Sequence, residues 1–288
     1  YDKITRADSA IGAVVDELEA QGILNNTLIV FLADNGRGFG RSKIHIHDSG
    51  VRVPFIAHWP EGIREPNRVS QDLVSSIDLA STFLELAGGS LDGTTFQGRS
   101  LVPIFENQEA YDHRQVVFSE RNHHIWEAHE RGARTQDFLY IKNRRPEIQR
   151  RGSDNEDDYS YWIARDQLGL EGMDEAHSWF FEACPPEELF DVENDPDMLH
   201  NLANSTAHHE ILQDLRSALK NWEVQTGDTA PENLTQHYRN PNHRDRPRVS
   251  EPVETLIGEQ PGWAYWKEKS RAAIIDEAAT TRSADWLP

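Results

Sequence analysis

The order of apolar and polar residues predicts alternating helices and strands in the first third of the chain. Between residues 4 and 22, apolar side chains recur at helical spacing and stop at a glycine, which indicates an amphipathic helix. Residues 27–33 form a continuous apolar run, typical of a strand buried on both faces of a parallel sheet. Residues 51–59 indicate a second strand and residues 73–86 a second helix. This alternation predicts an α/β fold.

The pattern changes after residue 105. Short apolar runs at residues 116–118, 138–141 and 188–190 are typical of antiparallel strands, and residues 209–224 have the spacing of a helix. We therefore expect a smaller α+β subdomain with an antiparallel sheet. The expected domains are residues 1–110 (α/β), 111–226 (α+β subdomain) and 227–288 (an extended arm rich in Pro, Asn, Arg and Asp).

The charge of the chain argues against several classes of function. The chain has 29 Lys and Arg against 49 Asp and Glu, a formal net charge of −20, which repels the phosphate backbone of nucleic acids. No apolar run approaches the roughly 18 residues of a membrane span. Cys184 is the only cysteine, so an internal disulfide framework and a Cys-rich zinc site are excluded. We expect neither nucleic acid nor membrane as a partner, and we interpret Cys184 as a small packed residue.

Two oxygen-bearing side chains follow the first predicted strand. Asp34 and Asn35 come directly after residues 27–33, and ligand sites of α/β sheets lie beyond the carboxyl ends of strands. A carboxylate beside an amide carbonyl suits calcium or magnesium better than zinc. The same Asp-Asn-Gly sequence is also a common turn, so it leaves a metal site and a plain turn both open.

The order of several motifs resembles the type I, formylglycine-dependent sulfatases of the alkaline phosphatase superfamily. These motifs are Asn26-Thr27, Asp34-Asn35-Gly36, Lys43, residues 50–54 and residues 77–79, followed by residues 188–191, 194–196 and 201–203. The resemblance spans about residues 1–224. It implies the C-terminal part of a large mixed sheet flanked by helices, the end of a catalytic domain, plus the smaller α+β subdomain. Tyr1 would then lie inside a longer protein.

Three segments further resemble the heparan N-sulfatase (sulfamidase) group and its bacterial relatives. They are residues 35–43, residues 118–124, which contain a His-His pair, and residues 134–147. By this resemblance Asp34 and Asn35 are calcium ligands, and Lys43 contacts the sulfate or the leaving-group oxygen. The residues expected to bind substrate are His45, His47, His123, His124 and Arg134.

Each of these residues also has a plain structural interpretation. Lys43 could be a solvated loop residue. The histidines could satisfy local hydrogen bonds, and Arg134 could form a salt bridge at a strand edge. The nucleophile of the family is a formylglycine made within a Cys/Ser-x-Pro-x-Arg motif, which does not occur in this sequence. The resemblance therefore places it in a preceding part of the protein.

The sequence thus predicts the C-terminal part of a calcium-dependent sulfatase. Its substrate would be a sulfate ester or N-sulfate of an acidic, glycosaminoglycan-like saccharide such as N-sulfoglucosamine, and the 288 residues alone would be inactive. The resemblance implies a periplasmic, secreted or lysosomal location and leaves homo-oligomerisation open. Two alternatives stay open: a related phosphatase or phosphodiesterase, and a non-catalytic carbohydrate-binding homologue.

Overall fold

A computed structural model describes most of the first 228 residues. The described residues are 2–38, 41–93, 96–108, 111–123, 127–148, 169–173, 178–179, 182 and 184–228. The predicted arm over residues 227–288 lies outside this part of the chain except for its first two residues. The boundary that we expect between residues 110 and 111 stays a prediction.

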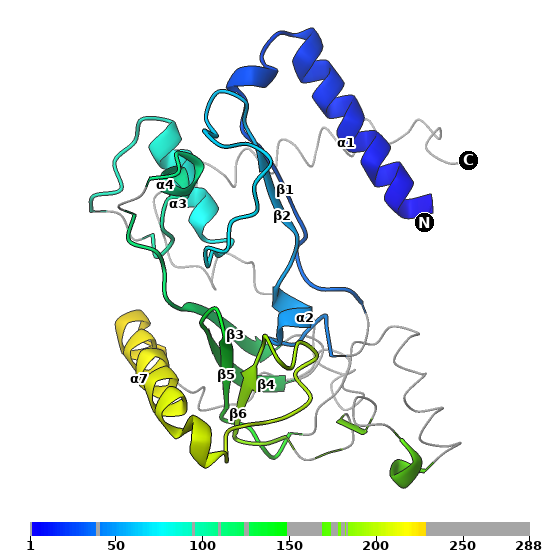
Figure 1. Ribbon diagram of the computed structural model, residues 1–288, viewed down its shortest axis with the longest axis vertical. Coiled ribbons are helices and arrows are strands. Elements are labelled where there is room, and N and C mark those ends of the chain that lie inside the picture. The colour runs from blue at the N-terminus through cyan, green and yellow to red at the C-terminus, as the bar shows by residue number, and fades with distance from the viewer. Residues whose placement is uncertain are drawn as a thin grey trace, which may run out of the picture. The chain divides into compact units, whose positions relative to one another are not determined.

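The N-terminal region consists of a long helix and a two-stranded sheet (Figure 1). Helix α1 (Asp2–Ala20) and the 3-10 turn Leu24–Asn26 lead into β1 (Ile29–Leu32), which pairs with β2 (Phe55–His58). The predicted helix and both strands are confirmed. Their pairing differs from our expectation, because β1 and β2 run antiparallel within the described residues and Phe31 is 42% exposed. Among the described residues, β1 pairs with β2 alone and has no parallel neighbour, so the apolar run of residues 27–33 did not indicate the strand direction.

Three short helices follow, namely α2 (Asp48–Val51), α3 (Asp78–Leu86) and α4 (Val102–Phe105). Helix α3 begins five residues later than the pattern predicted. Asp78, at its first position, is 1% exposed and accepts two hydrogen bonds from Arg114 and two from backbone N–H groups. This carboxylate is therefore a structural anchor.

The second half of the described chain forms a four-stranded antiparallel sheet. Its strands lie in the order β3 (Val117–His123), β4 (Glu127–Arg134), β5 (Phe138–Asn143) and β6 (Glu187–Asp191). The 3-10 turns Leu170–Gly172 and Thr206–His208 and helix α7 (His209–Thr226) complete the described elements. The predicted antiparallel subdomain is confirmed, and β4 is a strand that the apolar pattern did not reveal.

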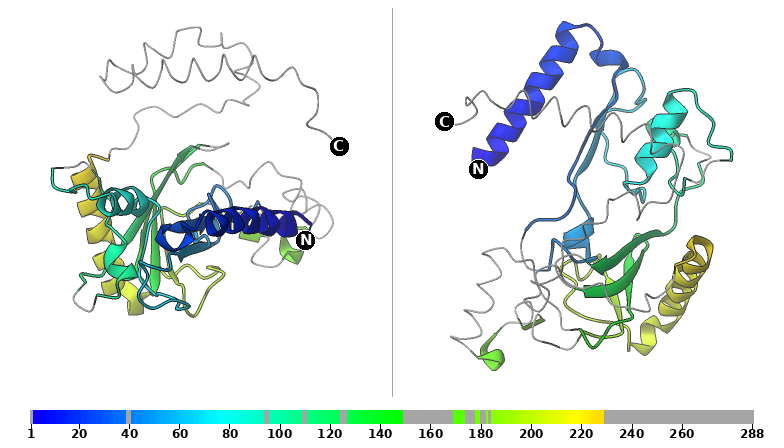
Figure 2. Two further views of the ribbon diagram at one scale, coloured as in Figure 1. Left: turned by 90° about the horizontal axis from the view of Figure 1, so that it is seen from above. Right: turned by 180° about the vertical axis from the view of Figure 1, so that it is seen from behind.

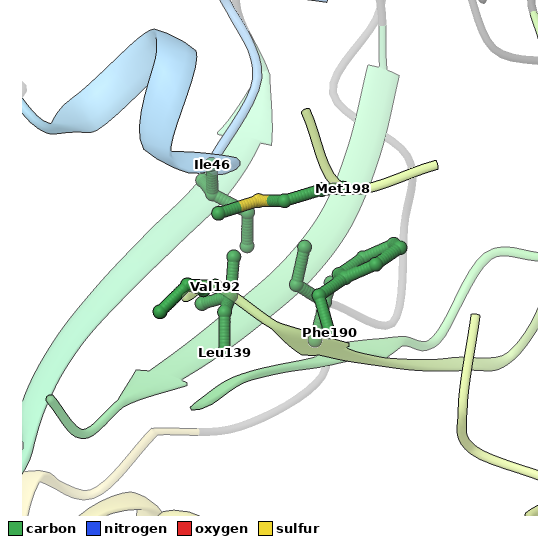
Figure 3. Close-up of a cluster of buried hydrophobic side chains, with 6 residues drawn as sticks. Ile46, Leu139, Phe190, Val192 and Met198 are labelled. Atoms are coloured by element: carbon green, nitrogen blue, oxygen red, sulfur yellow. The ribbon is translucent and has the colours of Figure 1, made fainter. Parts of the chain in front are cut away.

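Two different elements cover the two faces of this sheet. Helix α7 lies along one face (Figures 1 and 2), where Leu212, Leu215 and Leu219 pack against Ala133, Tyr140 and Leu189. On the other face, Ile46 from the loop before α2 packs with residues of β5, β6 and the segment after β6 (Figure 3). The α/β region is thereby joined to the sheet through the loop of residues 41–47, which carries Lys43.

Candidate active site

The Asp34-Asn35-Gly36 turn follows β1 and is fixed by a close backbone approach. The amide N–H of Gly36 donates to the carbonyl of Gly50 at 2.7 Å. A Cβ atom on Gly36 would lie 1.9 Å from the carbonyl oxygen of Ser49, so only glycine fits here. The Asn35 side-chain amide donates to the Gly36 carbonyl at 2.6 Å, which uses the nitrogen and leaves the side-chain oxygen as the acceptor.

Lys43 lies in a loop with an unusual backbone. Arg41 and Ile44, on either side of it, have positive φ angles of 56° and 75°. For a β-branched residue such as isoleucine this conformation is an outlier, and strain of this kind clusters at functional sites. The Lys43 amide donates to the Arg37 carbonyl at 3.0 Å, and within the described residues no carboxylate forms a salt bridge with its ammonium group.

Asp34, Asn35 and Lys43 line one open cleft. Asp34 is exposed and the other two side chains are partly buried. The walls come from the ends of β1 and β2, from the loop before α2, and from residues 117–122 of β3. The three residues for which the sequence predicted metal binding and catalysis therefore line the same cleft, and their roles stay predictions.

His45 and His47 are buried, with exposed fractions of 3% and 4%. Both rings contact Trp179 edge-on, at centroid distances of 5.1 and 5.5 Å, and His47 also packs against Phe190. His45 lines the cleft, whereas His47 is not part of its lining. Of the two, only His45 thus lines the same cleft as Lys43, and the predicted substrate contacts stay predictions.

The His-His pair falls at the edge of what the structure describes. His123 ends β3, where its backbone pairs in register with Glu127, after a register shift between Arg121 and His123. His124 lies outside the described residues. The predicted role of this pair in substrate binding stays a prediction.

Arg134 lines the cleft, but its guanidinium already has protein acceptors. Its Nε donates to Asp48 Oδ1 at 3.1 Å and its Nη2 to Asp48 Oδ2 at 3.0 Å. The remaining nitrogen, Nη1, donates to the carbonyl of Thr135. The predicted substrate contact of Arg134 stays a prediction, and the observed contacts are those of the alternative structural interpretation.

Arg121 is a cleft residue that sequence reasoning did not single out, although it lies in the segment of residues 118–124. Its side chain is 8% exposed. Nη1 lies 3.3 Å from Glu130 Oε2 and 3.3 Å from His45 Nδ1. Because arginine has no acceptor, Nδ1 of His45 is the acceptor in this contact. Arg131, one strand position beyond Glu130, is buried in a two-pronged ion pair with Asp228 on the opposite face, so it is not a cleft residue.

Comparison with known proteins finds similarity to one family. Residues 1–90 match the family model described as Sulfatase. An ulvan-active sulfatase of Formosa agariphila is 34% identical over 237 residues, which cover 80% of this chain and 38% of that protein. This chain is a sulfatase homologue. N-sulphoglucosamine sulphohydrolase of Homo sapiens is 26% identical over 245 residues, covering 79% of this chain and 47% of that enzyme. The chain thus spans less than half the length of these two relatives.

Solved structures support the fold. A 2-O GAG sulfatase aligns with a TM-score of 0.57 and 21% identity over 77% of this chain and 41% of its own. A protein solved with its substrate D-glucosamine-2-N,6-O-disulfate aligns with a TM-score of 0.56 and 23% identity, covering 79% of this chain and 40% of its own. These similarities confirm the predicted sulfatase fold of the alkaline phosphatase type.

The donor set in this sulfatase homologue fits part of a calcium site. Asp34 and Asn35 offer side-chain oxygens, the ligands that calcium prefers. Among the described residues, however, no group of three or more His, Cys, Asp or Glu side chains is arranged to hold a metal ion. Calcium takes about six to eight oxygen ligands, so these two residues would be a minority of the shell.

None of the helices in the described part is long and apolar enough to cross a membrane. Cys184 is 6% exposed and accepts a hydrogen bond from the Asn143 amide at 2.8 Å, which confirms that it is a packed residue.

Proposed function

We propose that the complete protein containing this chain is a calcium-dependent sulfatase that hydrolyses sulfate esters or N-sulfates of an acidic saccharide. The observation that carries the proposal is the cleft that Asp34, Asn35 and Lys43 share at the end of β1. Homology to sulfatases over most of the described residues supports the same reaction class.

Each of the three residues has a chemical task in this proposal. The oxygens of Asp34 and Asn35 would hold calcium, which when bound supplies positive charge to the oxygens of the sulfate group. The Lys43 ammonium would lie against the sulfate or the leaving-group oxygen and stabilise the charge that develops there. The absence of a described salt bridge at Lys43 is consistent with that task, because no carboxylate already neutralises its charge.

The nucleophile would come from outside these 288 residues. The sequence contains no Cys/Ser-x-Pro-x-Arg motif from which a formylglycine could be made. We therefore propose that this segment alone has no turnover.

For the substrate, we propose a glycosaminoglycan-like saccharide. Relatives of the chain include N-sulphoglucosamine sulphohydrolase and the ulvan-active sulfatases, whose names connect them with sulfated sugars. The chain as a whole is acidic, yet Lys43, Arg52 and Arg68 line the cleft. In this proposal these cations contact the sulfated anion, within a lining that also carries carboxylates such as those of Glu65, Asp72 and Asp137. A periplasmic, secreted or lysosomal location is part of the proposal, and homo-oligomerisation stays an open prediction.

The test is sulfate release by the complete protein from N-sulfated and O-sulfated glucosamine, with a phosphate monoester as comparison. Lys43→Met should lower kcat by about 100-fold or more, as loss of a charge-stabilising donor does. Lys220→Met, whose side chain is 67% exposed on α7, serves as the matched control and should keep full activity.

Other results would reject the proposal in recognisable ways. Hydrolysis of the phosphate monoester alone would favour the phosphatase alternative, and saccharide binding without turnover would favour a non-catalytic homologue. Release from the O-sulfated sugar alone would keep the sulfatase assignment but reject the resemblance to the N-sulfatase group.

A further inference from the structure

The loop that carries Lys43 is strained and needs external support. The positive φ angles at Arg41 and Ile44 are unfavourable for side chains of their kind. Conformations of this type persist only where the surrounding structure holds them. The position of the Lys43 ammonium in the cleft therefore depends on whatever fixes this loop.

One polar contact that fixes the loop comes from β4 of the antiparallel sheet, beside the contacts of Arg41 with the Met198 carbonyl and of Arg121 with His45. Asp48 begins α2, directly after the loop. Arg134 of β4 donates hydrogen bonds to both of its carboxylate oxygens, at 3.1 and 3.0 Å. The two side chains are 15% and 12% exposed, so solvent screens this pair only in part. Arg52 also approaches Asp48, but at 3.9 Å and with a side chain that is 74% exposed, so its contact is weak.

Apolar packing places the same loop on the same face of the sheet. Ile46 lies over Leu139, Val192 and Met198 (Figure 3). Its Cδ1 would be 3.4 Å from a Cβ atom at Gly132, the β4 residue two positions before Arg134. The loop thus rests on the sheet at Ile46 and is tied to it at Asp48.

We propose that Arg134 is a positioning residue, which holds the Lys43 loop in its active conformation through Asp48 and does not itself bind substrate. Three of the five guanidinium N–H groups, one on each nitrogen, already donate to Asp48 or to the Thr135 carbonyl, and the Asp48 carboxylate pairs with the positive charge. The part of this inference that concerns catalysis rests on the proposed sulfatase function.

A double-mutant cycle in the complete protein tests the proposal. Arg134→Gln and Asp48→Asn should each lower kcat by about 10- to 100-fold, the effect of misplacing a catalytic group by about 1 Å, while KM changes little. The double variant should be no worse than the poorer single variant, because both changes break one interaction. Arg134→Lys should recover part of the activity. Arg99→Gln, which removes an ion pair with the 95% exposed Asp112 outside the cleft, is the control that should match the wild type.

Amide hydrogen exchange adds a readout that is independent of activity. The amides of Lys43 and His45 donate to the carbonyls of Arg37 and Ser42, both at 3.0 Å. In Arg134→Gln these two amides should exchange faster than in the wild type, while amides of the β1–β2 pair keep their protection.

Three results would overturn the proposal. A rise in KM at unchanged kcat for Arg134→Gln, with Asp48→Asn silent, would show that Arg134 binds substrate. Additive losses in the cycle would show that the two residues act separately. Unchanged exchange at Lys43 and His45 would show that the loop does not need the pair. An inactive wild-type protein would instead reject the proposed function, and the exchange comparison would still decide whether Arg134 holds the loop.

Discussion

Replacing Asp78 tests how the segments around the cleft are held together. Its carboxylate accepts from both Nη atoms of Arg114 at 2.6 Å and from the backbone N–H groups of Ser75 at 2.7 Å and Arg99 at 2.8 Å. The side chains of Asp78 and Arg114 are 1% and 10% exposed. Asp78→Ala therefore leaves four donors without their acceptor, among them a buried guanidinium.

The expected loss of unfolding free energy follows from these four unsatisfied donors. Removing one partner of a buried ion pair costs about 3–5 kcal/mol of unfolding free energy, because the other charge stays buried and unpaired. Asp78→Asn keeps one carbonyl acceptor and should lose less. Asp112→Ala removes a carboxylate that is 95% exposed and lies 3.6 Å from Arg99, so it should leave stability unchanged.

Urea unfolding of the complete protein, followed by circular dichroism, measures these differences. The Asp78→Ala midpoint should fall well below that of the wild type and of Asp112→Ala, with a similar slope. If Asp78→Ala unfolded at the same urea concentration as Asp112→Ala, the network around Asp78 would not be a stabilising anchor and the reasoning would be wrong.

Three further predictions follow from other contacts. Gly36→Ala, whose Cβ would meet the Ser49 carbonyl, should weaken calcium binding by about 10- to 100-fold in calorimetry, whereas Gly12→Ala, with open space around it, should not. Arg131 holds the pKa of Asp228 below its ordinary value of 3.8, so the stabilisation by this carboxylate is complete above that value and is lost as the pH falls through the lowered pKa. Consequently, when the pH is lowered from 6 to below the lowered pKa of Asp228, the free energy of unfolding should fall less for Asp228→Asn than for the wild type. Leu215→Ala, at a side chain 3% exposed between α7 and the sheet, should cost about 2–5 kcal/mol in denaturant unfolding.

The apolar pattern predicted those elements whose buried side chains are apolar. Strand β5 and helix α7 were found because Tyr140, Leu215 and Leu219 fill one core. Strand β4 was missed because charged residues carry its buried positions. Arg131 is paired with Asp228, which lies 97 residues later in the sequence, so periodicity alone could not show that the position is buried.

The candidate site residues could be predicted where the order of the sequence motifs identified them. Asp34, Asn35 and Lys43 were identified from the sequence, and they do line one cleft. The antiparallel pairing of β1 with β2 could not be predicted from the sequence, because an apolar run fits either strand direction. The contact of Arg134 with Asp48 joins residues 86 positions apart and required the structure.

Calcium-dependent sulfate release by the complete protein tests the central claim most directly. A chelator should abolish the activity of the wild type, and added calcium should restore it. Asp34→Ala should remain inactive at every calcium concentration that restores the wild type, because it lacks one of the proposed metal ligands. Turnover by Asp34→Ala with an unchanged calcium response would contradict the account.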